Sequence, residues 1–145
     1  PLFLKVAPDL DEAAVRDIAE LALTFGLDAL IVSNTTLQRP PQLTSDDRGE
    51  AGGLSGQPLF QISTLVLRLF AQALAGRLPL VGVGGVASGS EALVKIKAGA
   101  SAVQIYSAMV FQGPGLISQI LDELDGLLAA EGFDSVAEAV GVETR

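Results

Sequence analysis

The sequence predicts an α/β fold in which four parallel strands are each followed by a helix. Four short apolar runs alternate with segments whose apolar side chains recur at helical spacing, which is typical of parallel sheets. With 49% hydrophobic and 18% charged residues, the 145-residue chain has the composition of one globular domain. A doubly wound sheet and a (β/α)8 TIM barrel both fit this order. Four such units make half of an eight-unit barrel, which typically has about 250 residues.

The first unit opens directly on a strand, residues 2–7. Asp11 is expected to cap a helix that runs to about Phe25, and Gly26 ends it. Five apolar residues of this helix are expected to face the sheet, namely Ala14, Ile18, Leu21, Ala22 and Phe25. Since an opening in mid-strand is unusual for a natural start, we expect this chain, residues 1–145, to be the C-terminal half of the barrel, with the other half upstream.

The second unit begins with a continuous apolar strand at residues 29–33, of the kind that is buried on both faces. A long polar excursion follows at residues 37–56. Loops of this length without a regular pattern are uncommon and often functional, as lids or binding loops, and a disordered surface insertion is the alternative. Asp9, Asp46 and Asp47 are expected to be solvated charges, because no spacing among them requires a metal site.

The third and fourth units complete the pattern. The strands are expected at residues 80–83 and 102–105. The helices are expected at 58–75, 90–98 and 115–130, and a short helical tail at 135–140. The apolar faces of the first and last of these helices are expected to comprise Ile62, Leu65, Val66, Leu69, and Ile117, Ile120, Leu121, Leu124, Leu127.

Paired glycines mark a candidate phosphate site. Gly84 and Gly85 follow the third strand, just before a helix whose N–H groups and dipole would favour an anion. About 20 residues later the fourth strand ends in Tyr106 and Ser107, and barrel enzymes commonly build phosphate sites from the loops after their last two strands. Tight turns that bind nothing are the alternative reading of these glycines.

Composition excludes several classes of partner and site. A net charge of −8 without a basic run argues against nucleic acid and against an anionic membrane surface. The chain has no cysteine and no histidine, so neither thiolate nor imidazole chemistry is available to it. Residues 98–121 hold no charged side chain, but the breaker Gly113-Pro114-Gly115 favours a buried strand, a loop and a helix start over a membrane span.

Three side chains at strand ends are informative. Lys5 lies within an apolar strand, where an ammonium either reaches solvent or meets an anion or polar ligand, and we favour the ligand. Asn34 and Thr35 follow the second strand, where they either bind a planar polar substrate or cap the chain as it leaves the strand.

Several motifs resemble one family over essentially the whole chain. Leu4-Lys5-Val6-Ala7-Pro8-Asp9, Ser33-Asn34-Thr35-Thr36 with Arg39-Pro40, Gly52-Gly53-Leu54-Ser55-Gly56, Gly82-Val83-Gly84-Gly85-Val86 and Val103-Gln104-Ile105-Tyr106-Ser107 occur in the order seen in dihydroorotate dehydrogenases. The Gly-Gly-Leu-Ser-Gly block is shared by both classes of that family. Asn-Thr-Thr followed closely by Arg-Pro, and Val-Gln-Ile-Tyr-Ser, resemble the quinone-dependent class 2 enzymes.

The resemblance implies an FMN-dependent barrel that oxidises dihydroorotate to orotate in pyrimidine (UMP) biosynthesis and passes the electrons to a quinone. By the same resemblance, two residues bind the substrate, Asn34 and Thr35. Those that hold the flavin or its phosphate are Lys5, Ser33, Ser55, Gly56, Gly84, Gly85, Tyr106 and Ser107. Ser33 and Ser107 stand where the family more often has threonine, and both keep the hydroxyl.

Other family features fall outside these 145 residues. The catalytic base is a serine of the N-terminal half, so no catalytic residue is expected here, and the chain alone is expected to be inert. The resemblance also implies peripheral attachment to the cytoplasmic face of a membrane. Two rival functions remain, a phosphate-binding barrel isomerase or lyase without flavin, and a non-enzymatic half barrel that pairs with itself.

Overall fold

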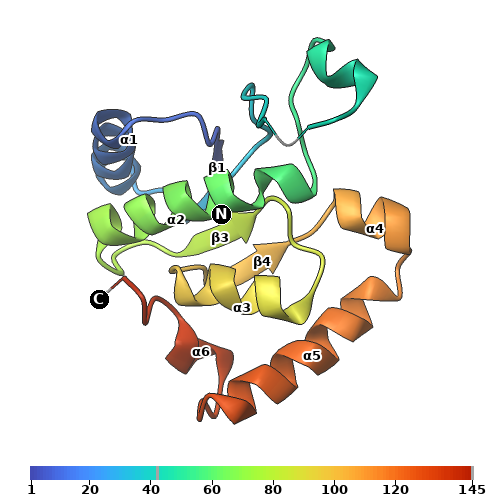
Figure 1. Ribbon diagram of the computed structural model, residues 1–145. Coiled ribbons are helices and arrows are strands. Elements are labelled where there is room, and N and C mark those ends of the chain that lie inside the picture. Colours follow the sequence, from blue (N-terminus) through green and yellow to red (C-terminus); the bar gives the residue numbers. More distant parts are fainter. Residues whose placement is uncertain (42, 145) are drawn as a thin grey trace.

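The computed structural model describes residues 1–41 and 43–144, and it has the expected alternation of strands and helices (Figure 1). The four strands are β1 (Phe3–Val6), β2 (Ala29–Val32), β3 (Leu80–Val83) and β4 (Ala102–Gln104). The helices are α1 (Glu12–Thr24), α2 (Phe60–Leu74), α3 (Gly89–Lys97), α4 (Ser107–Gln112), α5 (Leu116–Ala130) and α6 (Val136–Ala139), with short 3-10 helices at Asp46–Gly49 and Gln57–Leu59.

The strands form one parallel sheet in the order β1-β2-β3-β4. Val6 pairs with Val32, Val32 with Gly82, and Gly82 with Val103. Every carboxyl end therefore reaches the same edge of the sheet. The expected strands are confirmed to within a residue or two at each end, and Asp11 caps α1 by accepting a hydrogen bond from the Ala14 N–H at 2.8 Å.

The largest core lies between the sheet and helices α1 and α2. Leu30 and Val32 from β2 pack with Leu67 and Phe70 from α2, and all four are fully buried. A second apolar cluster lies between α3 and α5, which run side by side in Figure 1, and includes Leu93, Ile96, Leu124 and Leu128.

Five residues expected in the core are exposed instead. These are Leu21, Phe25, Leu65, Ile117 and Leu121. Each helix carries two adjacent apolar rows, and periodicity alone does not tell which row turns inward. On α1 the small side chains of Ala19 and Ala22 are buried, and on α5 the buried row is Leu116, Ile120, Leu124 and Leu128.

The sheet has two open edges. Leu2, Phe3 and Leu4 at β1 are 43–65% exposed, and β4, expected to be a buried strand, is also largely exposed. Each of these strands has a single neighbour, which explains the exposure. The uncharged run at 98–121 spans β4, a helix not expected from the sequence (α4) and the start of α5; among the described residues no helix is long and apolar enough to cross a membrane.

The excursion after β2 is organised by two side chains. The Arg39 guanidinium donates hydrogen bonds to the carbonyls of Arg48, Glu50 and Gly52 at 2.7–3.0 Å, and Thr36 and Leu54 form an antiparallel bridge. Asp9 accepts hydrogen bonds from the Thr36 hydroxyl and the Leu37 N–H.

Asp9 is therefore an anchor of the excursion and not merely a solvated charge. Although partial burial acts to raise it, hydrogen bonds from Thr36, Leu37 and Gln38 hold the pKa of Asp9 below its usual value. Gln42, within the excursion, lies outside the described residues.

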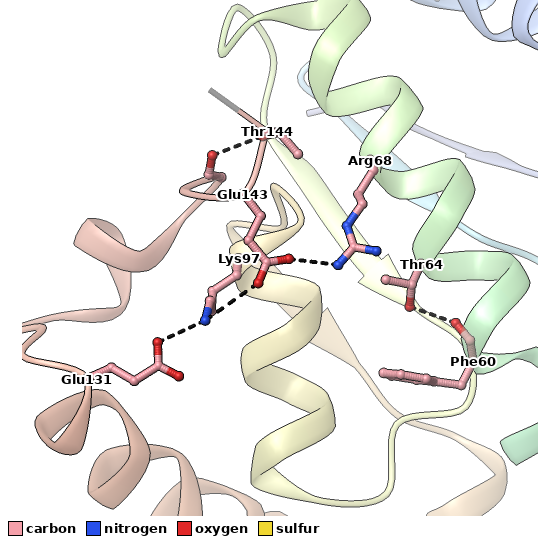
Figure 2. Close-up of polar contacts among 8 residues, drawn as sticks. Phe60, Thr64, Arg68, Lys97, Glu131, Glu143 and Thr144 are labelled. Atoms are coloured by element: carbon pink, nitrogen blue, oxygen red, sulfur yellow. Dashed lines mark hydrogen bonds and ion pairs between the residues drawn. The ribbon is translucent and has the colours of Figure 1, made fainter.

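Ion pairs tie the last residues of the chain to the helices. The Glu143 carboxylate lies 2.7 Å from Arg68 on α2 and 3.5 Å from Lys97 on α3, and Lys97 also pairs with Glu131 at 2.9 Å (Figure 2). The partly exposed network closes the side of the molecule opposite the carboxyl ends of the strands.

Two glycines of the α3–α5 pair predict opposite effects on stability. A Cβ on Gly89 would overlap Glu123 and lie 2.7 Å from the Leu124 nitrogen, whereas a Cβ on Gly126 meets nothing within 4 Å. We expect Gly89→Ala to lower the unfolding free energy by about 1–3 kcal/mol. Gly126→Ala should raise it by about 0.5–1 kcal/mol, because alanine favours the helix. Thermal unfolding midpoints of both variants check this, and a midpoint for Gly89→Ala at or above the unmodified protein's would contradict it.

Candidate functional site

A cavity of about 680 Å³ lies at the carboxyl ends of the strands. The loops after all four strands contribute to its lining, which follows from their shared direction. All ten site residues expected from the sequence line this one cavity: Lys5, Ser33, Asn34, Thr35, Ser55, Gly56, Gly84, Gly85, Tyr106 and Ser107. Among residues 1–41 and 43–144 there is no cluster of three or more acidic side chains that could hold a metal ion.

The turn after β3 is built on glycine. Gly84 and Gly85 have φ values of 109° and 76°, which favour glycine, and a Cβ on Gly85 would lie 2.6 Å from the Phe60 Cβ. In the described part of the chain, the N–H groups of Gly85 and Val86 donate to no protein acceptor. Free N–H groups beside a cavity are suited to binding an anion.

The start of α3 does not contribute to this anion site, contrary to the expectation from the sequence. The Ala87 N–H donates to Glu91 at 2.7 Å, the Gly89 N–H donates to Glu123 at 2.7 Å, and the Glu91 N–H donates to the Ser88 hydroxyl. Two carboxylates thus already accept from N–H groups at this helix end, and their charge would repel a phosphate. After β3, the candidate cradle is therefore the Gly84–Val86 turn without the start of α3.

Lys5 supplies the only charge on the described lining of the cavity. It is exposed at the open β1 edge and not buried within the strand. No carboxylate forms an ion pair with it among the residues that the structure describes. In a protein of net charge −8, one cation without an acidic neighbour makes this cavity locally favourable to an anion or an electron-rich ring.

Three polar residues follow β2, and they differ in burial, hydrogen bonding and packing. Ser33 is 1% exposed, and its hydroxyl donates to the Asn34 carbonyl at 2.9 Å. The Asn34 side-chain oxygen accepts from the Thr35 N–H at 2.9 Å, which leaves its amide NH2 as a donor. The Thr35 side chain packs directly against Gly53, where a Cβ would overlap it, so the excursion fixes its position. The capping and ligand-binding readings of Asn34 are therefore compatible.

Ser107 joins two loops across the cavity. Its hydroxyl donates to the Ser55 hydroxyl at 3.0 Å, and Gly56 lies against its side chain. Tyr106, just before α4, is 76% exposed and lines the same cavity.

Sequence reasoning missed several lining residues, among them Gln57, Gln104, Phe111 and Gln112. The last two belong to α4, whose six residues lack a cap or a clear period. Behind the cavity lies another missed residue, the buried Lys95. Its signal was its place three residues after Ala92, at helical spacing on the buried face of α3.

Comparison with known proteins gives consistent relatives. The model of the family described as "Dihydroorotate dehydrogenase" matches residues 1–128. The chain is 54% identical over its full length to the dihydroorotate dehydrogenase (quinone) of Xanthobacter autotrophicus, and 57% identical over 97% of its length to that of Cereibacter sphaeroides. It spans 41% and 40% of those two proteins.

Solved structures agree with the sequence relatives. The chain superposes over its full length on dihydroorotate dehydrogenase from Eimeria tenella in complex with ferulenol, with a TM-score of 0.96 and 43% identity, and covers 39% of that chain. The ligand-free enzyme from the same organism gives the same score. The four strands and their helices are thus the parallel α/β portion of this family's barrel, so the doubly wound alternative is discarded. The chain belongs to the dihydroorotate dehydrogenase family.

Proposed function

We propose that this chain supplies the flavin- and substrate-binding loops of a quinone-dependent dihydroorotate dehydrogenase, which oxidises dihydroorotate to orotate in pyrimidine biosynthesis. The observation that carries the proposal is the meeting of all ten expected residues in one cavity. The family match and the relatives of the quinone type support it. A barrel isomerase or lyase without flavin has no comparable support.

The cavity fits FMN in size and chemistry. Its volume of about 680 Å³ is in the range of sites for such ligands. The free N–H groups of Gly85 and Val86 would hold the phosphate, together with the Ser107 hydroxyl, whose single proton would turn from the Ser55 hydroxyl to a phosphate oxygen. Side chains at Gly84 and Gly85 would require φ values that other residues rarely adopt, and a Cβ on Gly85 would collide with Phe60. When bound, FMN supplies the two-electron redox chemistry that links substrate to quinone.

Lys5, Asn34 and Thr35 would act at the other end of the cavity. Lys5 would stabilise an electron-rich ring, because its ammonium is the one positive charge on the described lining. The Asn34 amide and the Thr35 hydroxyl would bind the pyrimidine, one as a donor and the other as donor or acceptor. The buried Ser33 hydroxyl, held by the Asn34 carbonyl, would contact the flavin through its remaining acceptor capacity.

The reaction needs groups that these residues do not provide. The described lining holds no carboxylate and no histidine, and Lys5 and Tyr106 are its only titratable side chains. We therefore propose that the base that removes the substrate proton comes from the N-terminal half of the barrel. That half, dihydroorotate and a quinone are the proposed partners, with peripheral attachment to the cytoplasmic face of a membrane and no role for nucleic acid.

An anaerobic flavin titration tests this function. Protein expressed from the complete gene should be yellow, should lose its flavin absorbance when dihydroorotate is added, and should regain it with a soluble quinone. A flavin that stays oxidised would remove the proposed substrate. Protein that binds a phosphate ester but no flavin would favour the isomerase or lyase, and assembly without FMN affinity would favour the self-pairing half barrel.

Lys5→Met is expected to lower kcat by about a hundredfold, because one preorganised charge is lost from beside the reacting ring. Stopped-flow reduction of the flavin by dihydroorotate measures the step directly. Arg16→Met removes the same charge from the exposed face of α1, where Arg16 pairs with Glu12, and should leave kcat unchanged. Equal rates for the Lys5 and Arg16 variants would contradict the role of Lys5.

Ser107→Ala should weaken FMN binding by about ten- to a hundredfold, the usual cost of one hydrogen bond to a charged group. Ser107→Thr keeps the hydroxyl and should bind FMN as the unmodified protein does. Fluorescence titration of the apoprotein gives both dissociation constants. If alanine and threonine have the same effect, the hydroxyl does not hold the phosphate.

A further inference from the structure

Lys95 on α3 is a fully buried lysine without a carboxylate partner. Its side chain is 0% exposed, and no ion pair reaches it among the described residues. The ammonium Nζ instead donates to the Ser63 hydroxyl at 2.6 Å and to the Phe60 carbonyl at 3.5 Å, and it lies 5.0 Å from the centre of the Phe60 ring. Burying an amine without a carboxylate partner costs free energy on folding, so we expect Lys95 to have a role beyond packing.

The partners of Lys95 are the residues against which the glycine turn packs. The Ser63 hydroxyl lies 3.1 Å from the Gly84 carbonyl as well as from the Phe60 carbonyl. A Cβ on Gly84 would lie 2.8 Å from the Ser63 oxygen, and one on Gly85 would lie 2.7 Å from the Phe60 nitrogen. The amine, the hydroxyl and the turn therefore form one contiguous unit directly behind the free N–H groups.

The protonation of the amine sets the direction of the Ser63 hydrogen bonds. A protonated Lys95 can only donate to the Ser63 hydroxyl, which leaves the single Ser63 proton for the carbonyl of Gly84 or Phe60, whereas a neutral amine could accept that proton. This links the amine to the backbone conformation of the turn.

The pKa of Lys95 lies close to neutral pH, so the charged and the neutral form of the amine are both accessible. Burial lowers the pKa of Lys95 to about 7, Arg68 on α2 acts in the same direction, and Glu91 one turn earlier on α3 opposes them. Strand β3, whose Gly82 lies against the Lys95 Cβ, has no titratable residue, and Glu123 of α5 is held at the Gly89 N–H. An anion close to this amine would favour its protonated form.

We propose that Lys95 is a positioning residue for a phosphate ester: through Ser63 it holds the Gly84–Gly85 turn in its binding shape, and its positive charge balances the phosphate. The proposal rests on the proposed function, in which that ester is FMN. Lys95 is not among the residues that line the cavity, and in this proposal it acts only through the turn.

The first test separates the phosphate from the ring of the ligand. In apoprotein expressed from the complete gene, Lys95→Met should weaken FMN binding at least about tenfold, which corresponds to one lost charge interaction. Riboflavin, which lacks the phosphate, should bind within twofold of the unmodified protein. Lys97→Met removes the same charge two residues away, where Lys97 pairs with Glu131 at the surface, and should change neither constant.

The second test uses pH. Phosphate binding should raise the pKa of Lys95, so a proton is taken up on binding and affinity falls as pH rises. For an increase of one unit, the FMN dissociation constant should rise about fivefold between pH 7 and 9. The second ionisation of the phosphate, at about pH 6, lies below this range. Lys95→Met should abolish this pH dependence of the FMN dissociation constant. If Lys95 has only a structural role, the variant should show the same pH dependence as the unmodified protein.

Several outcomes overturn the proposal. These are an unchanged FMN constant in Lys95→Met, equal losses for FMN and riboflavin, or the same pH slope with and without the amine. If Lys95→Met does not fold, Ser63→Ala keeps the amine and removes the link, and it must weaken FMN more than riboflavin. If the unmodified protein binds no FMN, the proposed function fails separately. The role of Lys95 is then tested by measuring the binding of inorganic phosphate. Equal phosphate affinities of the unmodified protein and Lys95→Met would reject the proposed role.

Discussion

The close approach of the Gly84–Gly85 turn to the first turn of α2 is the constraint on which the cavity depends. There is no room for a side chain between Gly85 and Phe60, or between Gly84 and Ser63. This tight packing constrains the backbone of the turn, whose Gly85 and Val86 line the cavity with N–H groups that donate to no acceptor among the described residues. The same contact places Ser63 and Phe60 where they are the hydrogen-bond partners of Lys95. A single packing contact thus fixes the positions of the turn, of the start of α2 and of the hydrogen-bond partners of Lys95.

An acidic protein can offer an anion site when its carboxylates are occupied elsewhere. Glu91 and Glu123 accept hydrogen bonds from the N–H groups at the start of α3, and hydrogen bonds from Gln119 and from Gly89 hold the pKa of Glu123 below its usual value. Asp9 is bound to the excursion after β2, and Glu131 and Glu143 pair with basic residues on the far side of the molecule. Within the part of the chain that the structure describes, the cavity lining has Lys5 and no carboxylate. Net charge therefore says little about a site whose charges are arranged locally.

The sequence predicted the strands well because strands depend on local signals, and the residues it proposed for the site all line one cavity for the same reason. Apolar runs that end in glycine or hydroxyl residues mark strand ends, and parallel strands bring those ends together. What the sequence did not reveal depends on contacts between distant residues. Glu123 reaches the start of α3 from 34 positions away, although Ser88 and Glu91 carried a readable capping pattern. Leu21 and Leu65 lie on apolar rows whose direction only the neighbouring helices decide.

The exposed apolar residues are explained by the site and the open sheet together. Phe3 and Leu4 at β1, and Val110 and Phe111 on α4, are 43–87% exposed and lie beside the two strands that have a single neighbour. Phe111 also lines the cavity, and Lys5 stands on β1 itself, so the cavity reaches both open edges. Whatever covers those edges would also complete the walls around the ligand. In the proposed enzyme, a segment that closes the sheet would lie beside the cavity and could bring the base close to Lys5 and Asn34. Barrel closure and catalytic competence would then be one event, in agreement with a described lining that holds no carboxylate and no histidine.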